Sequence, residues 1–409
     1  MNRKYFCRST VITMFITVLI SLMAGYANAA DTGQFDLDVI FVIDNSGSML
    51  RADPNKLALT ASNLFIDMCE DSDSRIGYVM YTDRIASSQA LTDISMFSEE
   101  LKKAISSTRY QQTGDTDTAL GLEKALEMLE LDSLNGKSAR KPVIILLSDG
   151  NTDLPNPVTR TTEQSLAALQ VVTGKLASKG IPVYTIGFNY DGKLDVEAMR
   201  NIAETTGAMA QEAKTADELP LILRRIYGDL TGANSISFPV IKATGQPQSV
   251  TIPIDNESVY KATITIMSRN AVKNVSLTSP AGNIYDETDT TGKLTTNKDP
   301  SGKYTLLSLY NPVKGNWTLT FTGTKDDVVS IDLLSVYDLK LVMDLPAASF
   351  GKTDISWHLE DANGNNVNDA SLIAGLTVTL HANNDSVVEV FPAGQTTSSF
   401  ALAPGDYEA

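Results

Sequence analysis

The stretch Val39-Ile40-Phe41-Val42-Ile43-Asp44-Asn45-Ser46-Gly47-Ser48 decides the fold expected for this chain. Five apolar residues, most of them β-branched, run without interruption and predict a strand that is buried on both faces. The run ends at Asp44, and one carboxylate and two hydroxyls then alternate along a turn in which Gly47 permits a tight bend. In open α/β sheets, ligands bind at the carboxyl ends of the strands. Oxygen ligands that carry a single charge suit Mg²⁺ or a similar ion, so this turn predicts part of a divalent-cation site.

Strand and helix signals alternate from Phe35 to about residue 230. Besides the opening strand, strands are expected at 75–81, 86–94, 142–147 and 181–187, with 86–94 at an edge. Helices are expected at 54–68, 97–106, 119–129, 162–178, 195–206 and 216–230. Pro54 fits the first turn of the first helix. This alternation predicts an α/β fold, a Rossmann-like doubly wound and mostly parallel sheet with helices on both faces.

Two further polar loops are expected at the same edge of this sheet. Residues 114–118 open the helix that starts near 119, and residues 148–150 follow the strand 142–147. Thr116 adds a third hydroxyl and Asp149 a second carboxylate. The candidate metal ligands are therefore Asp44, Ser46, Ser48, Thr116 and Asp149. Five oxygen ligands leave open coordination positions for water or a partner's carboxylate, which suits octahedral Mg²⁺.

The segments 44–48, 114–118 and 147–150 resemble the three parts of the metal-ion-dependent adhesion site of von Willebrand factor type A (VWA) domains. The resemblance covers about residues 36–230, and the segments follow in family order. It implies that Ser46, Ser48 and Thr116 bind the cation through their hydroxyls. It also implies that Asp44 and Asp149 act mostly through bound water, and that a partner's Asp or Glu completes the coordination.

The family often has glycine at the position of Asp115, where this chain carries an extra charge. That charge could favour Ca²⁺ or weaken the capture of an acidic partner, but we expect the side chain to point to solvent. Mg²⁺ is the cation we expect, with Ca²⁺ and Mn²⁺ left open. Ser and Asp after a strand can also be plain N-caps of the next helix.

Other acidic residues near the loops are not expected to bind metal. Asp83, Asp117 and Asp153 are interpreted as solvated loop charges. The pair Asp36 and Asp38 precedes the opening strand instead of following it, so we do not interpret it as a phosphotransferase pair.

Residues 1–29 have the pattern of a secretory signal, with Arg3, Lys4 and Arg8 before an apolar run and Ala27-Asn28-Ala29 as the cleavage site. An uncleaved anchor is the alternative. The net charge of −16 excludes nucleic acid and anionic lipid as expected partners. Cys69 is the one cysteine after the signal, so no internal disulfide can form in the mature chain. We expect a secreted, cell-surface or periplasmic protein, and an exported chain without disulfides weakly favours a bacterial origin.

After residue 230 the helical pattern gives way to short alternating strands. Residues 235–338 predict an immunoglobulin-like β-sandwich with Trp317 in its core. Residues 339–409 predict a second, truncated β-sandwich, and a membrane anchor could lie beyond residue 409. His358 and His381 are interpreted as rim residues, with a metal-binding pair as the alternative.

The function expected is that of an exported binding module that captures an acidic side chain of a protein partner through a divalent cation. The first domain contains no histidine and no activated nucleophile, so we do not expect an enzyme. One alternative is a metal-dependent hydrolase in which Asp83 or Asp117 serves as the base. The other is a structural or assembly module whose metal loop is vestigial.

Overall fold

The computed structural model describes residues 36–408 apart from short gaps, which are 71, 112–114, 134–139, 150–151, 156–158, 193, 216–217, 232, 338, 345–352, 362–363, 369, 371–372, 374–377, 383–386, 393 and 401–406. Residues 35–337 form one compact unit, and the described residues after 337 belong to another. Each unit is described by itself.

The first unit begins with a six-stranded sheet of order β3-β2-β1-β4-β5-β6. All neighbours pair in parallel except β2 and β3, which are antiparallel. The strands are β1 (Leu37–Asp44), β2 (Arg75–Tyr81), β3 (Ile85–Asp93), β4 (Lys141–Ser148), β5 (Val183–Phe188) and β6 (Ala210–Ala213). The predicted doubly wound fold and the edge strand near 86–94 are confirmed. The sequence pattern does not predict β6, because Ala-Gln-Glu-Ala has no apolar run.

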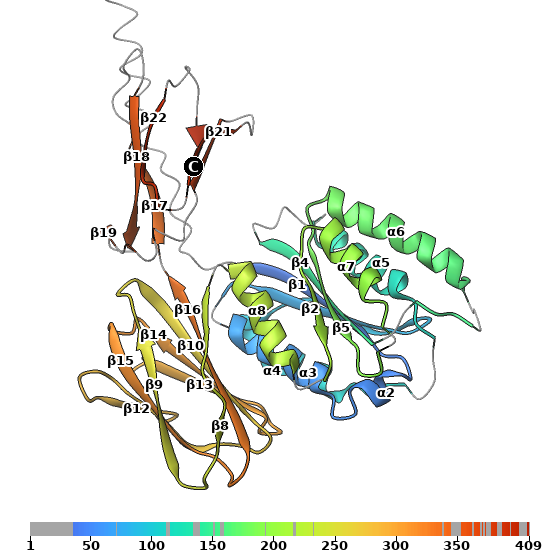
Figure 1. Cartoon of the computed structure of the whole chain (residues 1–409). Helices are drawn as coiled ribbons and strands as arrows, with labels where there is room; N and C mark the ends of the chain where they lie inside the picture. The colour runs from blue at the N-terminus through green and yellow to red at the C-terminus, as the bar shows by residue number, and fades with distance from the viewer. Residues whose placement is uncertain are drawn as a thin grey trace, which may run out of the picture. The chain divides into compact units, whose positions relative to one another are not determined.

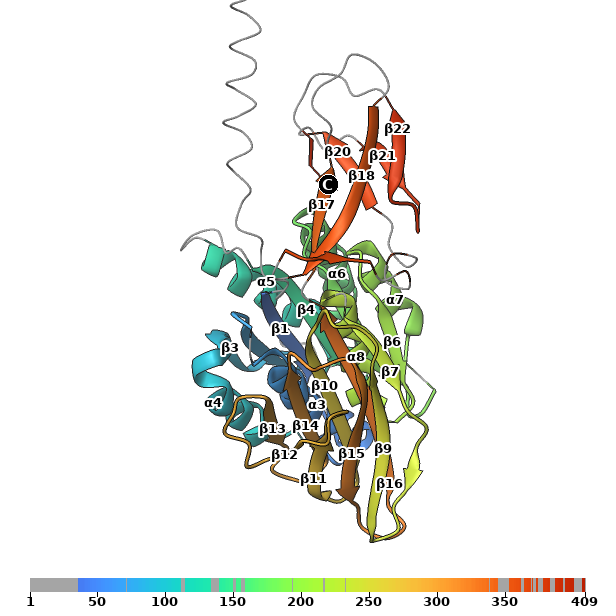
Figure 2. The same cartoon turned by 90° about the vertical axis from the view of Figure 1, so that its left-hand side faces the viewer.

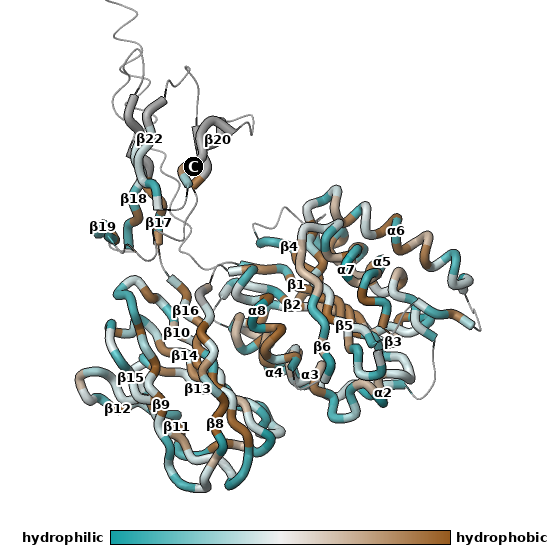
Figure 3. Tube along the Cα trace, viewed as in Figure 1, coloured by the Kyte–Doolittle hydropathy of each residue, from teal (hydrophilic) through white to brown (hydrophobic). Residues whose placement is uncertain are grey.

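Helices cover both faces of this sheet (Figure 1). One face carries α3 (Leu57–Cys69), α4 (Ile94–Ser107) and α8 (Leu219–Thr231), and the other carries α5 (Thr118–Ser133), α6 (Thr162–Ser178) and α7 (Val196–Thr205). The central strand β1 serves both cores, since Val39, Phe41 and Ile43 pack on the first face and Ile40 and Val42 on the second. Figure 3 shows the hydrophobic residues gathered along the central strands. The unbroken apolar run therefore reflects burial on two faces.

The first long helix starts later than its pattern predicts. A short helix, α2 (Met49–Ala52), follows the turn at residues 44–48, and α3 begins at Leu57. The Asp53 carboxylate accepts hydrogen bonds from the backbone N–H groups of Leu57 (2.7 Å) and Ala58 (2.8 Å). Lys56, just before α3, has a left-handed backbone with φ of 54°. Pro54 therefore lies in the connection between the two helices, and the expectation that it occupies the first turn of α3 is wrong.

A β-sandwich follows in the same unit. One sheet has the order β13-β14-β10-β16-β7 with β8 also paired to β16, and the other has the order β12-β11-β15-β9. The strands are β7 (Asn234–Ser237), β8 (Ile241–Lys242), β9 (Pro247–Ile254), β10 (Val259–Ser268), β11 (Lys273–Thr278), β12 (Ile284–Asp286), β13 (Leu294–Lys298), β14 (Tyr304–Tyr310), β15 (Gly315–Thr322) and β16 (Val328–Tyr337). Trp317 is buried between the sheets, as predicted, and donates to the Val313 carbonyl at 2.9 Å.

The sandwich packs directly against the helices of the first sheet, and α3 lies beside β14 (Figures 1 and 2). Tyr304 donates its hydroxyl to the buried Asp67 carboxylate of α3 at 2.6 Å. Leu306 of β14 joins the same hydrophobic core as α3. A second link is the buried ion pair of Arg224 in α8 and Asp332 in β16. The two folds therefore share a core and two buried polar contacts.

The second unit contains two small antiparallel sheets, one with the order β17-β18-β19 in which β22 also pairs with β18, and one with the order β21-β20-β23. The strands are β17 (Leu339–Asp344), β18 (Thr353–Asp361), β19 (Asn366–Val367), β20 (Val378–Ala382), β21 (Val387–Phe391), β22 (Thr397–Phe400) and β23 (Tyr407–Glu408). Its core contains Trp357, Leu359, Val378 and Phe391.

The structure describes only some of the residues in two sequence-based expectations, those for the histidines and for the signal segment. His358 is half-buried and lies 3.2 Å from the Glu360 carboxylate, whereas the side chain of His381 and the whole expected signal segment 1–29 lie outside the description. Across the part of the chain that the structure describes, no helix is long and apolar enough to cross a membrane.

Candidate metal centre

Asp44 stands at the end of β1 and is fully buried. Its Oδ1 accepts the backbone N–H of Ser46 at 2.8 Å, which fixes the turn after the strand. Its Oδ2 accepts the hydroxyl of Ser148, the last residue of β4, at 2.7 Å. Because β1 and β4 are neighbours in the sheet, this bond joins two loops that are 104 residues apart in the sequence.

Ser46 and Ser48, in the loop after β1, connect Asp44 to Asp149 in the loop after β4. The Oγ atoms of Ser46 and Ser48 are 2.8 Å apart, and Ser48 donates to Oδ1 of Asp149 at 2.8 Å. Four of the five predicted ligands, Asp44, Ser46, Ser48 and Asp149, therefore form one hydrogen-bonded cluster.

Thr116, the fifth predicted ligand, lies directly before α5 and is buried. Its backbone forms an antiparallel bridge with Asp153, with N–H to O distances of 2.9 and 3.0 Å. The next residue, Asp117, donates its N–H to the Thr82 carbonyl at 3.1 Å, just after β2. Among the described residues, no hydrogen bond joins the Thr116 hydroxyl to the other four predicted ligands. The structure thus brings Thr116 to the same edge of the sheet through its backbone.

The electrostatics of the cluster favour a cation. Burial, and after it the charge of Asp44, raise the pKa of Asp149 to about 7. Burial also raises the pKa of Asp44, against the hydrogen bonds from Ser148 and Ser46. Within the described chain, no basic side chain is hydrogen-bonded to either carboxylate, and Oδ2 of Asp149 and Oδ1 of Asn45 are buried without a partner. Two buried carboxylates and an orphaned oxygen, surrounded by hydroxyls, fit a divalent cation.

The cluster contains fewer carboxylates than many metal sites. The described residues contain no group of three or more His, Cys, Asp or Glu side chains that could hold a metal ion. The predicted set has only two carboxylates, and its other members are hydroxyls. Such a set needs a hard cation that accepts neutral oxygen ligands.

The expectation that Asp83 and Asp117 are solvated is wrong. Asp117 has no exposed surface and forms an ion pair with Arg160 at 2.6 Å. Asp83 is also buried, and its hydrogen bond with Arg84 lowers its pKa. Asp153 is exposed, as expected. Sequence patterns did not reveal these pairs because the spacing of charges along a loop does not show which way the side chains turn.

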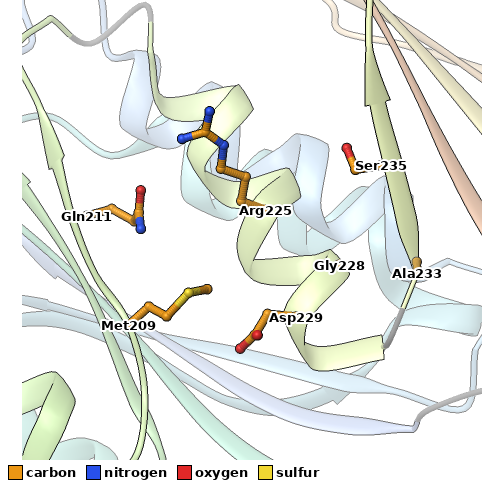
Figure 4. Close-up of a pocket in the computed structure, with 7 residues that line it drawn as sticks. All are labelled: Met209, Gln211, Arg225, Gly228, Asp229, Ala233 and Ser235. Atoms are coloured by element: carbon orange, nitrogen blue, oxygen red, sulfur yellow. The ribbon is translucent and has the colours of Figure 1, made fainter. Parts of the chain in front are cut away.

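An open pocket of about 530 Å³ lies beside α8 (Figure 4). It is lined by Met209, Gln211, Arg225, Gly228, Asp229, Ala233 and Ser235. None of these is a predicted ligand, and Asp229 accepts the hydroxyl of Tyr184 at 2.5 Å. The pocket lies near the amino end of β6, whereas the candidate ligands follow the carboxyl ends of other strands, so it is not part of the candidate metal centre.

The comparisons with known families agree with the fold. Residues 38–225 match the family model of the von Willebrand factor type A domain, and residues 236–332 match that of the Hemicentin galactose-binding domain-like family. Residues 38–225 of this chain are a VWA domain, as the three sequence segments predict.

Similar solved structures come from several sources. A von Willebrand factor type A protein from Catenulispora acidiphila is 16% identical, with a TM-score of 0.38, 81% of this chain covered and 64% of that chain. The pilus adhesin SpaC from Lactobacillus rhamnosus GG, in an open conformation, is 14% identical, with a TM-score of 0.37 and coverages of 91% and 52%. Proximal thread matrix protein 1 from the mussel byssus, with a zinc-occupied MIDAS motif, is 20% identical, with a TM-score of 0.36 and coverages of 50% and 50%. The chain therefore spans about half to two thirds of the length of these proteins. A comparison with curated proteins found no match.

Proposed function

We propose that the VWA domain binds a divalent cation, Mg²⁺ before Ca²⁺ or Mn²⁺, at Asp44, Ser46, Ser48, Thr116 and Asp149. The observation that carries this proposal is the pair of buried carboxylates that share one hydrogen-bonded cluster and, among the described residues, accept no hydrogen bond from a basic side chain. Ser46, Ser48 and Thr116 would hold the cation through their hydroxyls, and Asp44 and Asp149 would orient its water ligands and balance its charge.

We further propose that this site captures an Asp or Glu side chain of a protein partner. When bound, the cation supplies a coordination position that accepts a carboxylate oxygen, and hydroxyl ligands leave much of its charge available for that attraction. Together with the signal pattern at residues 1–29, this makes the chain an exported adhesion or protein-interaction module, either secreted, on the cell surface or periplasmic.

A hydrolytic function has less support in this arrangement. It needs a general base near the metal, and Asp83 and Asp117 are the carboxylates that could serve. Both are ion-paired, Asp83 with Arg84 at 3.2 Å and Asp117 with Arg160 at 2.6 Å. A carboxylate held by a guanidinium is a weak base, which favours binding over catalysis.

The metal part of the proposal can be tested by calorimetric titration of the EDTA-treated chain with MgCl₂ and MnCl₂. We expect one site per chain, and Ser46→Ala should lower the affinity at least about tenfold, since loss of even an outer-shell partner has that effect. Ser88→Ala, on the exposed face of β3, is the matched control and should bind as the wild type does. The absence of binding at millimolar Mg²⁺ or Mn²⁺ would support a vestigial site and overturn the proposal.

The capture of carboxylates can be tested with immobilised poly-L-glutamate. An acidic chain is repelled by this surface, so retention in Mg²⁺ and release by EDTA would mark specific coordination. Ser46→Ala separates this from general bridging by the metal, because it should not be retained. Equal retention of Ser46→Ala and the wild type would contradict capture at this site.

A further inference from the structure

A buried charge network lies next to the Thr116 loop, and the proposed metal chemistry does not use it directly. At its centre is Asp117, which is fully buried. Its Oδ2 accepts Nε of Arg160 at 2.6 Å, and its Oδ1 accepts Nη2 of Arg160 at 3.1 Å and Oγ of Ser165 at 2.6 Å. The N–H of Leu120 adds a fourth hydrogen bond at 3.1 Å. A carboxylate held this fully has a fixed position.

Arg160 also forms an ion pair on its other side, with Glu123. Glu123, in the second turn of α5, accepts from Nη2 at 2.9 Å and from Nη1 at 3.3 Å. Glu123 is about two-fifths exposed, whereas Asp117 is wholly enclosed. The desolvation cost therefore falls mainly on the buried Asp117–Arg160 pair, whereas water screens the interaction of Arg160 with Glu123.

The network joins the two loops that would supply Thr116 and Asp149. Arg160 and Ser165 lie on the segment that follows Asp149, and Asp117 follows Thr116 directly. The backbone bridge between Thr116 and Asp153 connects the same two segments at a second place. Two independent links thus tie the Thr116 loop to the segment after Asp149.

A helix cap alone does not account for this arrangement. An N-cap carboxylate needs only the bond to Leu120, at the start of α5. Three of the four hydrogen bonds that the Asp117 carboxylate accepts come instead from Arg160 and Ser165, outside α5. Arg160 and Ser165 reach Asp117 because the Thr116 loop pairs with the segment after Asp149.

We infer that Asp117 and Arg160 are positioning residues that hold the Thr116 hydroxyl in place for the cation, so that Thr116 and Asp149 form one preorganised half of the site. This inference rests on the proposed function. A hydroxyl carries no charge to draw it toward a metal ion, so its loop must already be ordered when the ion arrives. The Asp117–Arg160 pair supplies that order without adding a charge to the atoms that would bind the cation.

The test compares variants of the full chain by calorimetric titration with MnCl₂ and by hydrogen exchange of the amides at 115–120 in EDTA. Arg160→Gln should weaken Mn²⁺ binding about 10- to 100-fold and speed exchange in this loop. Arg160→Lys keeps the charge without the planar fork and should recover part of the affinity. Glu123→Gln removes only the outer partner and should stay within about twofold of the wild type.

The outcomes distinguish the positioning role of Asp117 and Arg160 from the proposed binding of a cation. If the wild type binds Mn²⁺ and a folded Arg160→Gln chain binds it equally well, the inference is overturned and the metal site stands. If the wild type does not bind Mn²⁺, the proposed function fails and the inference fails with it. Should Arg160→Gln not fold, Ser165→Ala decides, because it removes one hydrogen bond to Asp117 and no charge. It should weaken Mn²⁺ binding several-fold, and unchanged binding would again overturn the inference.

Discussion

At the scale of single residues, Asp44 and Asp149 place two carboxylates in a buried cluster where, among the described residues, neither accepts a hydrogen bond from a basic side chain. Such a pair destabilises the folded protein whenever both are ionised. The hydroxyls of Ser48 and Ser148 offset only part of that cost, since the pKa of Asp149 remains raised to about 7. Sites of this kind trade stability for binding.

Asp149→Asn should therefore stabilise the metal-free protein at neutral and alkaline pH. The ordinary pKa of this carboxyl is 3.8, so between about pH 4 and pH 7 the folded chain keeps a proton that the unfolded chain has lost. The stability of the wild type thus falls relative to the variant as the pH rises through this interval. The difference should then stay constant above about pH 7, at a few kcal/mol in order of magnitude. Urea unfolding in EDTA at pH 4 and pH 8 measures it.

Saturating Mg²⁺ provides the control for this prediction. It should raise the melting temperature of the wild type and leave that of Asp149→Asn nearly unchanged, because binding to the folded state alone adds stability. A variant that is less stable than the wild type at pH 8 in EDTA would show that Asp149 stabilises the metal-free fold, contrary to this account.

Sequence patterns singled out the residues of this candidate site, but they did not reveal the contacts that hold those residues in place. Asp44, Ser46 and Ser48 stand out because an apolar run stops at them, and the motif order points to Thr116 and Asp149. The contact of Ser148 with Asp44 spans 104 residues, and that of Arg160 with Asp117 spans 43. Local patterns carry no information about pairs so far apart, so the burial of Asp117 could not be predicted.

At the scale of elements, α5 packs unusually close to the sheet beneath the candidate centre. A Cβ atom at Gly121 would lie 2.8 Å from Cδ1 of Tyr81 and 2.8 Å from Cγ1 of Val42, both fully buried. Glycine is needed here for close approach, at a cost in helix propensity of about 1 kcal/mol relative to alanine. α5 follows Thr116, so the close packing of α5 on the sheet also sets how near the Thr116 loop comes to β1.

Gly121→Ala should lower the free energy of unfolding, because overpacking in a closed core costs about 1–3 kcal/mol and outweighs the gain in propensity. Gly174→Ala in α6 is the matched control, since a Cβ there meets nothing within 4 Å. It should stabilise the chain by about 0.5–1 kcal/mol. Urea unfolding of both variants compares them, and stabilisation by Gly121→Ala would show that α5 can move away from the sheet at no cost.

Elements with strong periodicity were predictable, and short ones were not. The central strands were found because burial on two faces leaves a continuous apolar run. The four-residue elements α2 and β6 lack any such signal. The start of α3 was misplaced because its N-cap position is Lys56, and the carboxylate of Asp53 accepts the first N–H groups of the helix, while Pro54 only resembles a first-turn residue.

At the scale of the whole first unit, the VWA domain and the β-sandwich share a buried polar interface. Arg224 and Asp332 are almost fully buried, and burial lowers the pKa of Arg224 against the pull of its partner. The change from alternating helices to strands predicts the boundary near residue 230. The sequence indicates the interface only weakly. The sequence of β14, Tyr-Thr-Leu-Leu-Ser-Leu-Tyr, does not alternate cleanly between apolar and polar residues, and in the structure the strand is buried almost throughout.

The Arg224–Asp332 pair should behave as a coupled unit in urea unfolding. Arg224→Met or Asp332→Leu alone leaves one buried charge without its partner and should cost about 3–5 kcal/mol. The double variant removes both charges and should recover most of that loss. Single and double variants whose losses simply add would show that the two residues do not interact across the interface.

In the site that we propose, three hydroxyls and two carboxylates from three loops hold one divalent cation. The most direct measurement is anomalous diffraction from a crystal of the full chain soaked in MnCl₂. We expect a manganese peak within about 2–2.5 Å of the hydroxyl oxygens of Ser46, Ser48 and Thr116, with Asp44 and Asp149 nearby. A crystal in which this position shows no peak, or in which manganese binds only elsewhere on the chain, would contradict it.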